Sequence, residues 1–419
     1  MATEIKIEDS NMAMFGGKEH KDWAFDKASL EKNYKGAGDK GPGIQIWRVK
    51  NMKRTDTSGP KFGIVKVDEK EHGTFYSGDS YIVLETYMKE SKKCFNLFFW
   101  LGRESSQDEI GVAAYKAVEL DDLLGDAPVQ YRELDGFESS HFLKLFKKSL
   151  NILKGGFESG FTKVKPEEYK PRLLHLKGAK KSTIVVREVD CKRDSLNEGD
   201  SFILDAGAAV YVFNGKSAGI WEKTRATQVS NGIIGGPGRG KSKREYVTSE
   251  EKGVESFWKA LGGYGSVPAE IPDEKKDTKS SGPSCNDLWK LSDSTGSLKL
   301  TKVSSTPTKS AVTSDDVFLL NRGNELLVYV GSKVSVQERY GAIGVGINFL
   351  KLNKMSDRTP ISKCIEGKND EEFLSLLNGT NGVDGTSARG HGGSTGGNGG
   401  STGDSNGPAS GPSNCCAII

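Results

Sequence analysis

The 419-residue sequence lacks several signals that would assign it to a familiar class of protein. It has no run of about 18 apolar residues, so we expect no membrane span. Residues 1–22 are polar and contain no apolar core segment, so they do not resemble a signal peptide. The charges nearly cancel, with 59 Lys and Arg against 56 Asp and Glu, so we expect no nucleic-acid partner.

Metal-binding and redox motifs based on histidine or cysteine are also missing. Only five histidines are present, which disfavours a His-rich metal site. The six cysteines form no C-x-x-C pair and lie far apart except for Cys415-Cys416, which fits a reducing cytosol. These absences disfavour zinc and thiol-redox chemistry.

Enzyme signatures are equally scarce. The sequence has no G-x-S-x-G, Walker or H-E-x-x-H motif. The glycine-rich stretch Gly235–Gly240 contains Pro237 and precedes a charged run, which favours a surface loop over a phosphate cradle. We therefore expect a protein without catalytic residues.

What the sequence does contain is an internal repeat with a period of roughly 120 residues, a domain length. An acidic position precedes an apolar strand-type run three times, at Gly78-Asp79, Gly199-Asp200 and Asp315-Asp316. A second run then ends at Trp100-Leu101-Gly102, Phe213-Asn214-Gly215 and Tyr329-Val330-Gly331. A glutamate lies nine positions after each bulky residue, at Glu109, Glu222 and Glu338.

The repeat predicts three tandem α+β domains, each a central mixed β-sheet between helices. In the first unit we expect strands at 44–49, 81–84, 92–101 and 129–134, and helices at 107–124 and 139–146. The predicted organisation is an N-terminal extension (1–35), domain 1 (36–157), domain 2 (158–270), a linker (271–285), domain 3 (286–378) and a Gly/Ser-rich tail (379–419). We expect the extension and the tail to be disordered.

The repeated carboxylates support two interpretations. Oxygen ligands without His or Cys favour Ca²⁺ or Mg²⁺ over transition metals. Alternatively, Asp after Gly is a common turn residue, and Glu in the first turn of a helix is a common partner of the helix dipole. Threefold recurrence at one register strengthens the metal interpretation, although repeats can also preserve turn chemistry.

Several stretches resemble the gelsolin/villin family, over roughly residues 36–378. Gly78–Leu84, Gln107–Glu109 with Gly111, Ala113 and Ala114, and Val118–Leu124 are similar to the first gelsolin-type domain. Gly155–Phe161 resembles the junction into the second domain, which Lys170–Leu174 and Arg225–Ser230 also resemble. The third unit matches more weakly. Three domains in this order are similar to the short, severin/fragmin-like members of the family.

The resemblance implies a Ca²⁺-regulated protein that severs actin filaments, caps their fast-growing ends and nucleates assembly. It implies calcium ligands at Gly78, Asp79, Glu109 and Phe157 in domain 1, at Gly199, Asp200, Glu222 and Asp273 in domain 2, and at Asp315, Asp316 and Glu338 in domain 3. It also implies an ion shared with actin at Asp121, with carbonyls near Asp126 and Pro128.

The resemblance further implies that the helix 108–124 enters the hydrophobic cleft of actin through Tyr115 and Val118. The alternative is that these residues face the core of their own domain. Arg172 and Lys223 are implied to contact the filament side. The implied phosphoinositide-binding bases are Lys147, Lys148, Lys154, Arg172, Lys177, Lys180 and Lys181, which would otherwise form a solvated charged face.

The tail ends in Cys416-Ala417-Ile418-Ile419, which matches a C-a-a-X prenylation box. One prenyl chain anchors only marginally, so Cys415 or the basic surface of domain 2 would supply a second contact. We expect a monomer of the cytoplasm and cytoskeleton, tethered to the cytoplasmic face of a membrane if the tail is prenylated. The alternative function is a prenylated protein that caps actin and tethers it to a membrane without severing. For the tail, the alternative is an unmodified segment with two free thiols.

Overall fold

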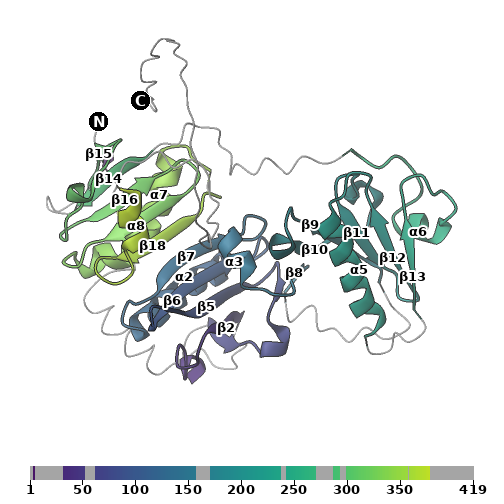
Figure 1. Ribbon diagram of the computed structural model, residues 1–419, viewed down its shortest axis with the longest axis horizontal. Coiled ribbons are helices and arrows are strands. Elements are labelled where there is room, and N and C mark those ends of the chain that lie inside the picture. The colour runs from purple at the N-terminus through teal and green to yellow at the C-terminus, as the bar shows by residue number, and fades with distance from the viewer. Residues whose placement is uncertain are drawn as a thin grey trace, which may run out of the picture.

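The computed structural model describes residues 3–4, 32–51, 62–156, 170–236, 242–269, 286–292, 299–356 and 358–377. We keep the names domain 1, domain 2 and domain 3 for the described parts of 36–157, 158–270 and 286–378. Figure 1 shows domain 1 between the other two domains. The linker 271–285 and the tail 379–419 lie outside the described residues.

Domains 1 and 3 contribute to one continuous sheet, which has 11 strands among the described residues. Its domain 1 strands are, in spatial order, β3 (Phe62–Lys66), β2 (Gly43–Asn51), β5 (Ser80–Lys89), β6 (Lys92–Leu101) and β7 (Val129–Leu134). Its remaining strands follow as β18 (Ile361–Ile365), β17 (Leu326–Val330), β16 (Val317–Asn321), β14 (Asp287–Ser292), β15 (Lys299–Ser304) and β1 (Thr3–Glu4). Because β6 pairs with β7 and β17 with β18 in parallel while the hairpins are antiparallel, the sheets are mixed, which confirms the α+β fold class.

Alternating side chains of the domain 1 strands build two apolar layers. One face carries Ile82 and Leu84 and is covered by α2 (Gln107–Leu123) through Ala113, Ala117 and Leu120. The other face carries the fully buried rings of Phe98 and Trp100 and is covered by α3 (Ser140–Lys144). Tyr34, within the 3₁₀ turn Lys32–Tyr34 of the predicted extension, is buried in the first layer and donates to the Lys116 carbonyl at 2.5 Å.

A second sheet, of seven strands among the described residues, holds domain 2. In spatial order it consists of β13 (Lys243–Val247), β12 (Ala209–Asn214), β11 (Ser201–Asp205), β9 (Arg172–Lys177), β10 (Val185–Val189), β8 (Leu150–Leu153) and β4 (Thr74–Tyr76). The last two strands come from the sequence of domain 1, so domain 1 lends strands to the sheet of domain 2. Helices α5 (Ile220–Ile234) and α6 (Glu255–Ala260) complete this domain.

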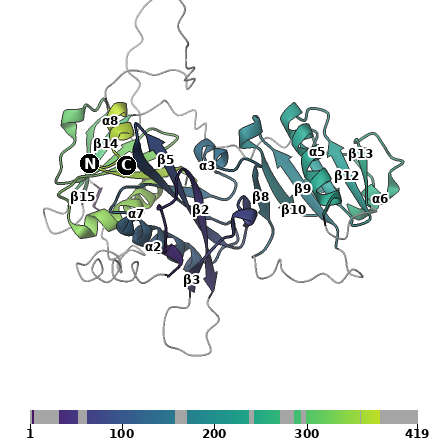
Figure 2. The same ribbon diagram turned by 60° about the horizontal axis from the view of Figure 1, so that its bottom comes forward.

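Domain 3 repeats the arrangement, with α7 (Val336–Leu352) and α8 (Glu371–Leu376) on its sheet. Its strand β18 joins β7 of domain 1 by antiparallel pairing, with Lys363 opposite Gln130. Helix α7 lies beside α2 (Figure 2), and Ile343 of α7 packs against the apolar cores of both domains. No helix within the described ranges is long and apolar enough to span a membrane.

Candidate functional site

The three repeated glycines explain one part of the motif. The amides of Gly102, Gly215 and Gly331 donate to the carbonyls of Asp79, Asp200 and Asp316, at 3.1, 3.0 and 3.2 Å respectively. A Cβ on Gly102 would lie 2.4 Å from the Asp79 carbonyl oxygen, and one on Gly331 would lie 2.2 Å from that of Ser314. The glycine is therefore needed for the backbone to hold each acidic loop this closely.

In domain 1 the loop before β5 brings together part of the predicted ligand set. The Gly78 amide donates to the Gly155 carbonyl at 2.8 Å, and Asp79 is only 9% exposed. Ser80 Oγ lies 3.1 Å from Ser105 Oγ, which joins this loop to the start of α2. There Glu109 accepts from the Ser106 amide at 2.9 Å in a capping box. The predicted ligand Phe157 lies outside the described residues.

In domain 2 both carboxylates of the predicted pair, Asp200 and Glu222, are buried. Burial alone would raise the pKa of Asp200, but hydrogen bonds from His175 (2.8 Å) and Asn197 (2.9 Å) and the charge of Lys177 hold that pKa below its usual value. Burial raises the pKa of Glu222, against the opposing hydrogen bonds from two backbone amides. Gly199 donates to the Asn197 side chain at 2.8 Å. Asp273 lies outside the described residues.

In domain 3 the predicted aspartate is also paired with a cation. Lys290 Nζ lies 2.7 Å from Asp316 Oδ2, which also accepts from Thr313 at 3.1 Å. Glu338 is buried and caps α7 through Ser335, as Glu109 caps α2. Asp315 is exposed, so only its neighbour Asp316 points into the buried contact.

The predicted position of a shared ion lies in the loop between α2 and β7. Asp126 adopts a left-handed backbone conformation (φ 58°), and its amide donates to the Asp121 carbonyl at 2.9 Å. Asp121 is 2% exposed, and its Oδ1 atom has no hydrogen-bond partner. A buried carboxylate oxygen without a partner beside backbone carbonyls fits a hard cation such as Ca²⁺. The described residues contain no cluster of three or more His, Cys, Asp or Glu that could hold a metal by themselves.

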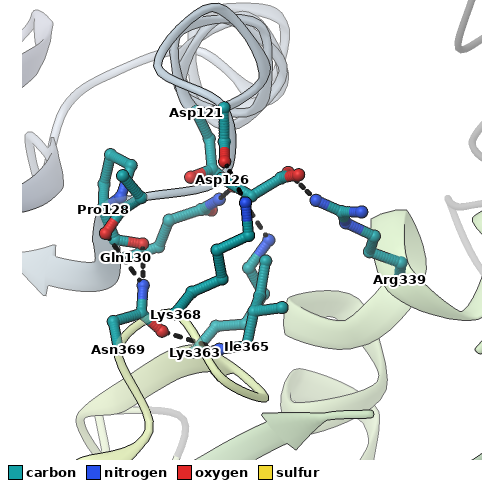
Figure 3. Close-up of polar contacts among 11 residues, drawn as sticks. Asp121, Asp126, Pro128, Gln130, Arg339, Lys363, Ile365, Lys368 and Asn369 are labelled. Carbon is teal, nitrogen blue, oxygen red and sulfur yellow. Dashed lines mark hydrogen bonds and ion pairs between the residues drawn. The ribbon is translucent and has the colours of Figure 1, made fainter. Parts of the chain in front are cut away.

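Domain 3 contacts each of these three predicted positions (Figure 3). Lys363 Nζ lies 3.4 Å from Asp121 Oδ2, and Arg339 forms an ion pair with Asp126. Asn369 Nδ2 donates to the Pro128 carbonyl at 2.7 Å. None of these contacts was predicted, because their partners are more than 200 residues apart in the sequence.

The predicted actin-binding helix is partly enclosed. Tyr115 and Val118 are half-buried. Half-burial fits both interpretations, contact with actin and contact with the core of domain 1. Glu119 is fully buried and pairs with Lys116 Nζ at 2.7 Å. Ile343 of domain 3 packs against the same apolar core as α2, so domain 3 lies next to this helix.

A cavity of about 630 Å³ lies between domains 1 and 2. Its cationic lining comes from Lys148, Arg172 and Arg225. The guanidinium of Arg225 donates to the Lys148 carbonyl, and its Nε is buried without a hydrogen-bond partner. Burial lowers the pKa of Arg225, which reflects its incomplete solvation. Sequence reasoning quoted Arg225 as part of a motif but did not identify it as a candidate ligand-binding residue.

The other predicted basic residues do not gather at this cavity. Lys147, Lys180 and Lys181 are exposed. Lys154 pairs with Asp190, and Lys177 lies 3.6 Å from Asp200. Lys223 is half-buried on α5. Arg172, which does line the cavity, also donates to Asp205 at 3.2 Å. The predicted lipidation residues Cys415 and Cys416 lie outside the described residues.

Comparisons with known proteins point to one family. The model described as "Gelsolin repeat" matches residues 61–143 and 182–258. The chain is 41% identical over 337 residues to "Gelsolin-like protein 1" of Lumbricus terrestris, covering 79% of this chain and 85% of that protein. It is 38% identical to "Actin depolymerising venom protein gelsolin 1" of Platymeris rhadamanthus (83% and 93% covered) and 36% identical to "Severin" of Echinococcus granulosus (84% and 91% covered).

Proposed function

The chain belongs to the gelsolin/villin family, and from this premise we propose that it binds actin, severs filaments and caps their ends in the cytoplasm. The similarity to an actin-depolymerising protein and to a severin over most of both chains supports this proposal. Nucleation of filaments is proposed on the same basis.

The observation that carries the proposal is the position of α2. This helix of 17 residues presents Tyr115 and Val118 at half-buried positions and carries Asp121 in its last turn. An amphipathic helix of this length can insert its apolar face into a groove of a partner. Because α7 of domain 3 packs beside it, we propose that actin binding requires domain 3 to move away.

Calcium would control that movement. Asp79 with Glu109, Asp200 with Glu222, and Asp316 with Glu338 each supply carboxylates at equivalent loops, with backbone carbonyls beside them. When bound, Ca²⁺ would supply two positive charges and a demand for six to eight oxygen ligands. In domains 2 and 3 that demand must displace Lys177 or Lys290 from the aspartate.

Fluorescence of pyrene-labelled actin filaments after dilution tests the proposal. We expect faster depolymerisation with calcium than with a chelator, and an at least tenfold weaker effect for Val118→Ser, on the order of the loss of one interfacial anchor. Val303→Ser, at an exposed position of β15, is the matched control and should act like the unchanged protein. No acceleration by the unchanged protein under either condition would refute the proposal.

The basic cavity favours a second function, the binding of polyphosphoinositide headgroups. Three cationic side chains around one cavity, one of them incompletely solvated, suit a multiply charged phosphate. We expect Lys148→Gln to weaken co-sedimentation with vesicles containing a bisphosphorylated inositol lipid by about fivefold. Lys192→Gln, an exposed base outside the cavity, should leave it unchanged. Equal binding by both variants would exclude the cavity as the site.

Membrane tethering by a prenylated Cys416 is a further proposal, and so is the alternative of capping without severing. Counting filaments by microscopy separates the two functions, because capping alone does not increase filament number. Membrane fractionation of Cys416→Ser tests the anchor, and a distribution equal to that of the unchanged protein would remove it.

A further inference from the structure

The sheet shared by domains 1 and 3 ends, on the side of domain 3, at β15 with β1 beside it. Both views show β15 at the outer end of domain 3, away from domain 2 (Figures 1 and 2). One side of β15 pairs with β14, and the other side pairs with the N-terminal strand β1. Without β1, that second side would carry unpaired backbone amides and carbonyls, which are a template for pairing with another chain.

The pairing of β1 with β15 is antiparallel and has a defined register. Thr3 lies opposite Leu300. Glu4 lies opposite Lys299. In an antiparallel ladder, residue pairs alternate between those that exchange both backbone hydrogen bonds and those that exchange none. One of these two pairs therefore satisfies the amide and the carbonyl of a β15 residue.

The second half of β15 is protected in a different way. Lys302 lies opposite Trp289. The next pair joins Ser304 to Leu288, so Val303 is an extra residue in β15. An extra residue of this kind is a β-bulge, which bends the strand and disrupts further pairing. Beyond residue 301, the edge therefore resists strand addition without any cover.

The first half of β15, residues 299–301, is regular. Its residues pair with 292, 291 and 290 of β14 in turn, without a shift of register. Leu300 is 1% exposed and belongs to the apolar core of domain 3, which fixes this stretch to the sheet. A regular strand fixed in this way presents evenly spaced backbone groups to a partner. The part of β15 without a bulge is therefore the part on which β1 lies.

This cover is tethered to the same molecule. Residues 5–31 connect β1 to the 3₁₀ turn Lys32–Tyr34, where Tyr34 is buried in the core of domain 1. A strand of two residues binds weakly by itself, because it forms few hydrogen bonds. The connection keeps it near β15 at an effective concentration well above that of a second copy in dilute solution. The N-terminal strand of the same chain is therefore the favoured occupant.

We infer that residues 299–301 of β15 are a strand-addition site whose occupant is the N-terminal strand of the same chain, and that this strand prevents two copies from pairing through β15. The excluded partner is a second copy of this chain, because two identical edges can pair antiparallel about a twofold axis. The inference goes beyond the proposed function and does not depend on it.

The experiment uses the full chain in three forms: unchanged, the double variant Thr3→Pro with Glu4→Pro, and the control Ser10→Pro with Asn11→Pro. Proline has no backbone N–H, and one of any two adjacent strand residues directs its N–H to the partner strand. The first variant therefore loses a donor to β15, whereas the control carries the same substitutions outside β1. Hydrogen exchange with mass spectrometry at 299–300 reports the cover, and sedimentation velocity at increasing protein concentration reports pairing of copies.

In dilute solution, we expect exchange at 299–300 to be about fivefold faster in the Thr3→Pro, Glu4→Pro variant, on the order of the loss of one hydrogen bond. The control should exchange like the unchanged chain, and exchange in β14 and β16 should be the same in all three forms. At higher concentration, the Thr3→Pro, Glu4→Pro variant should form dimers in which 299–300 is protected again. The other two forms should stay monomeric.

Unchanged exchange at 299–300 in the Thr3→Pro, Glu4→Pro variant would overturn the inference, and so would a variant that stays monomeric at every concentration. A dimer that leaves 299–300 unprotected would also overturn it, because the copies would then pair elsewhere. Faster exchange throughout β14 and β16 would do the same, since domain 3 itself would be loosened. None of these measurements contains actin or calcium, so the proposed function is tested separately.

Discussion

Domain 1 forms two junctions through strand pairing, and the two differ in what separation would cost. At the junction with domain 3, β7 and β18 are edge strands of sheets that are each complete without the other. At the junction with domain 2, β8 and β4 belong to domain 1 in sequence but lie in the sheet of domain 2, where β8 pairs with β10 and β4 pairs with β8. The first contact can open with both sheets whole, whereas opening the second would strip strands from a sheet.

The side chains at the two junctions follow the same division. The contact with domain 3 uses the carboxylates of Asp121 and Asp126, and the family resemblance assigns Asp121 to an ion shared with actin. The contact with domain 2 inserts Arg187 between Asp135 and Glu138, neither of which was predicted as a ligand. If calcium acts as proposed, the comparison predicts that it opens the junction with domain 3 and leaves the junction with domain 2 intact.

The largest expected effect is at the junction between domains 1 and 2. Arg187→Met should lower the free energy of unfolding by about 3–5 kcal/mol, because Asp135 and Glu138 would remain buried without a counter-charge. Urea denaturation followed by circular dichroism measures this change. Lys192→Met, which removes an exposed ion pair with Asp190, should give no measurable change. Equal stability of the two variants would show that the junction is not held by Arg187.

Next in size is a pH effect in the part of domain 1 that adjoins this junction. Burial raises the pKa of Glu133 to about 7, against hydrogen bonds from Ser139 and with nearby Glu138 raising it further. The folded-state pKa lies above the unfolded value, so the stabilising contribution is present below pH 4.5 and is lost as the pH rises through 7.

Glu133→Gln should therefore flatten this dependence. Relative to the variant, the unchanged chain should lose about 2–3 kcal/mol of stability between pH 5 and pH 8. Urea denaturation of both chains at the two pH values measures the difference. Parallel pH profiles would show that Glu133 titrates normally.

A smaller effect should separate the junctions directly. Calcium should speed amide hydrogen exchange at 130–132 of β7 and 361–363 of β18 by about tenfold or more, because these paired strands would separate. Exchange at 150–152 and 185–187, where β8 pairs with β10, should not change. Mass spectrometry of exchanged peptides gives both values from one sample. Faster exchange at both junctions would contradict the comparison.

The smallest effect is expected at the rim of the contact with domain 3. Lys89 pairs with Glu371 across the two domains, but both side chains are largely exposed, at 54% and 77%. Exposed pairs contribute little because water and salt screen them. Lys89→Met should leave the small-angle X-ray scattering profile unchanged, whereas Lys363→Met, which breaks the buried pair with Asp121, should expand the chain. An equal expansion by both variants would mean that burial does not decide the strength of these pairs.

The sequence predicted well whatever depends on local periodicity. The strand 92–101 and the helix 107–124 correspond to β6 (Lys92–Leu101) and α2 (Gln107–Leu123), because apolar spacing and the Ser106 capping box act over a few residues. The acidic loops recur at equivalent places for the same reason. Their status as metal ligands remains a prediction.

Contacts between domains could not be predicted in this way. Lys363 approaches Asp121 across 242 positions of sequence, and nothing in the residues around Lys363 marks its partner. Likewise Leu150–Leu153 reads as a short apolar run, and its position beside β10 follows from the path of the chain and not from its composition. Arg225 joins the basic cavity only because α5 faces domain 1.

The shared sheet has a consequence for how the gene can be divided. A polypeptide made of domain 2 alone would leave one side of β10 with unpaired backbone amides and carbonyls, since β8 normally covers them. An uncovered strand of this kind is a template for self-association. Expression fragments of domain 2 should therefore keep residues 74–76 and 150–153. Because β4 and β8 precede domain 2 in the chain, both strands are already synthesised when the rest of the second sheet emerges from the ribosome.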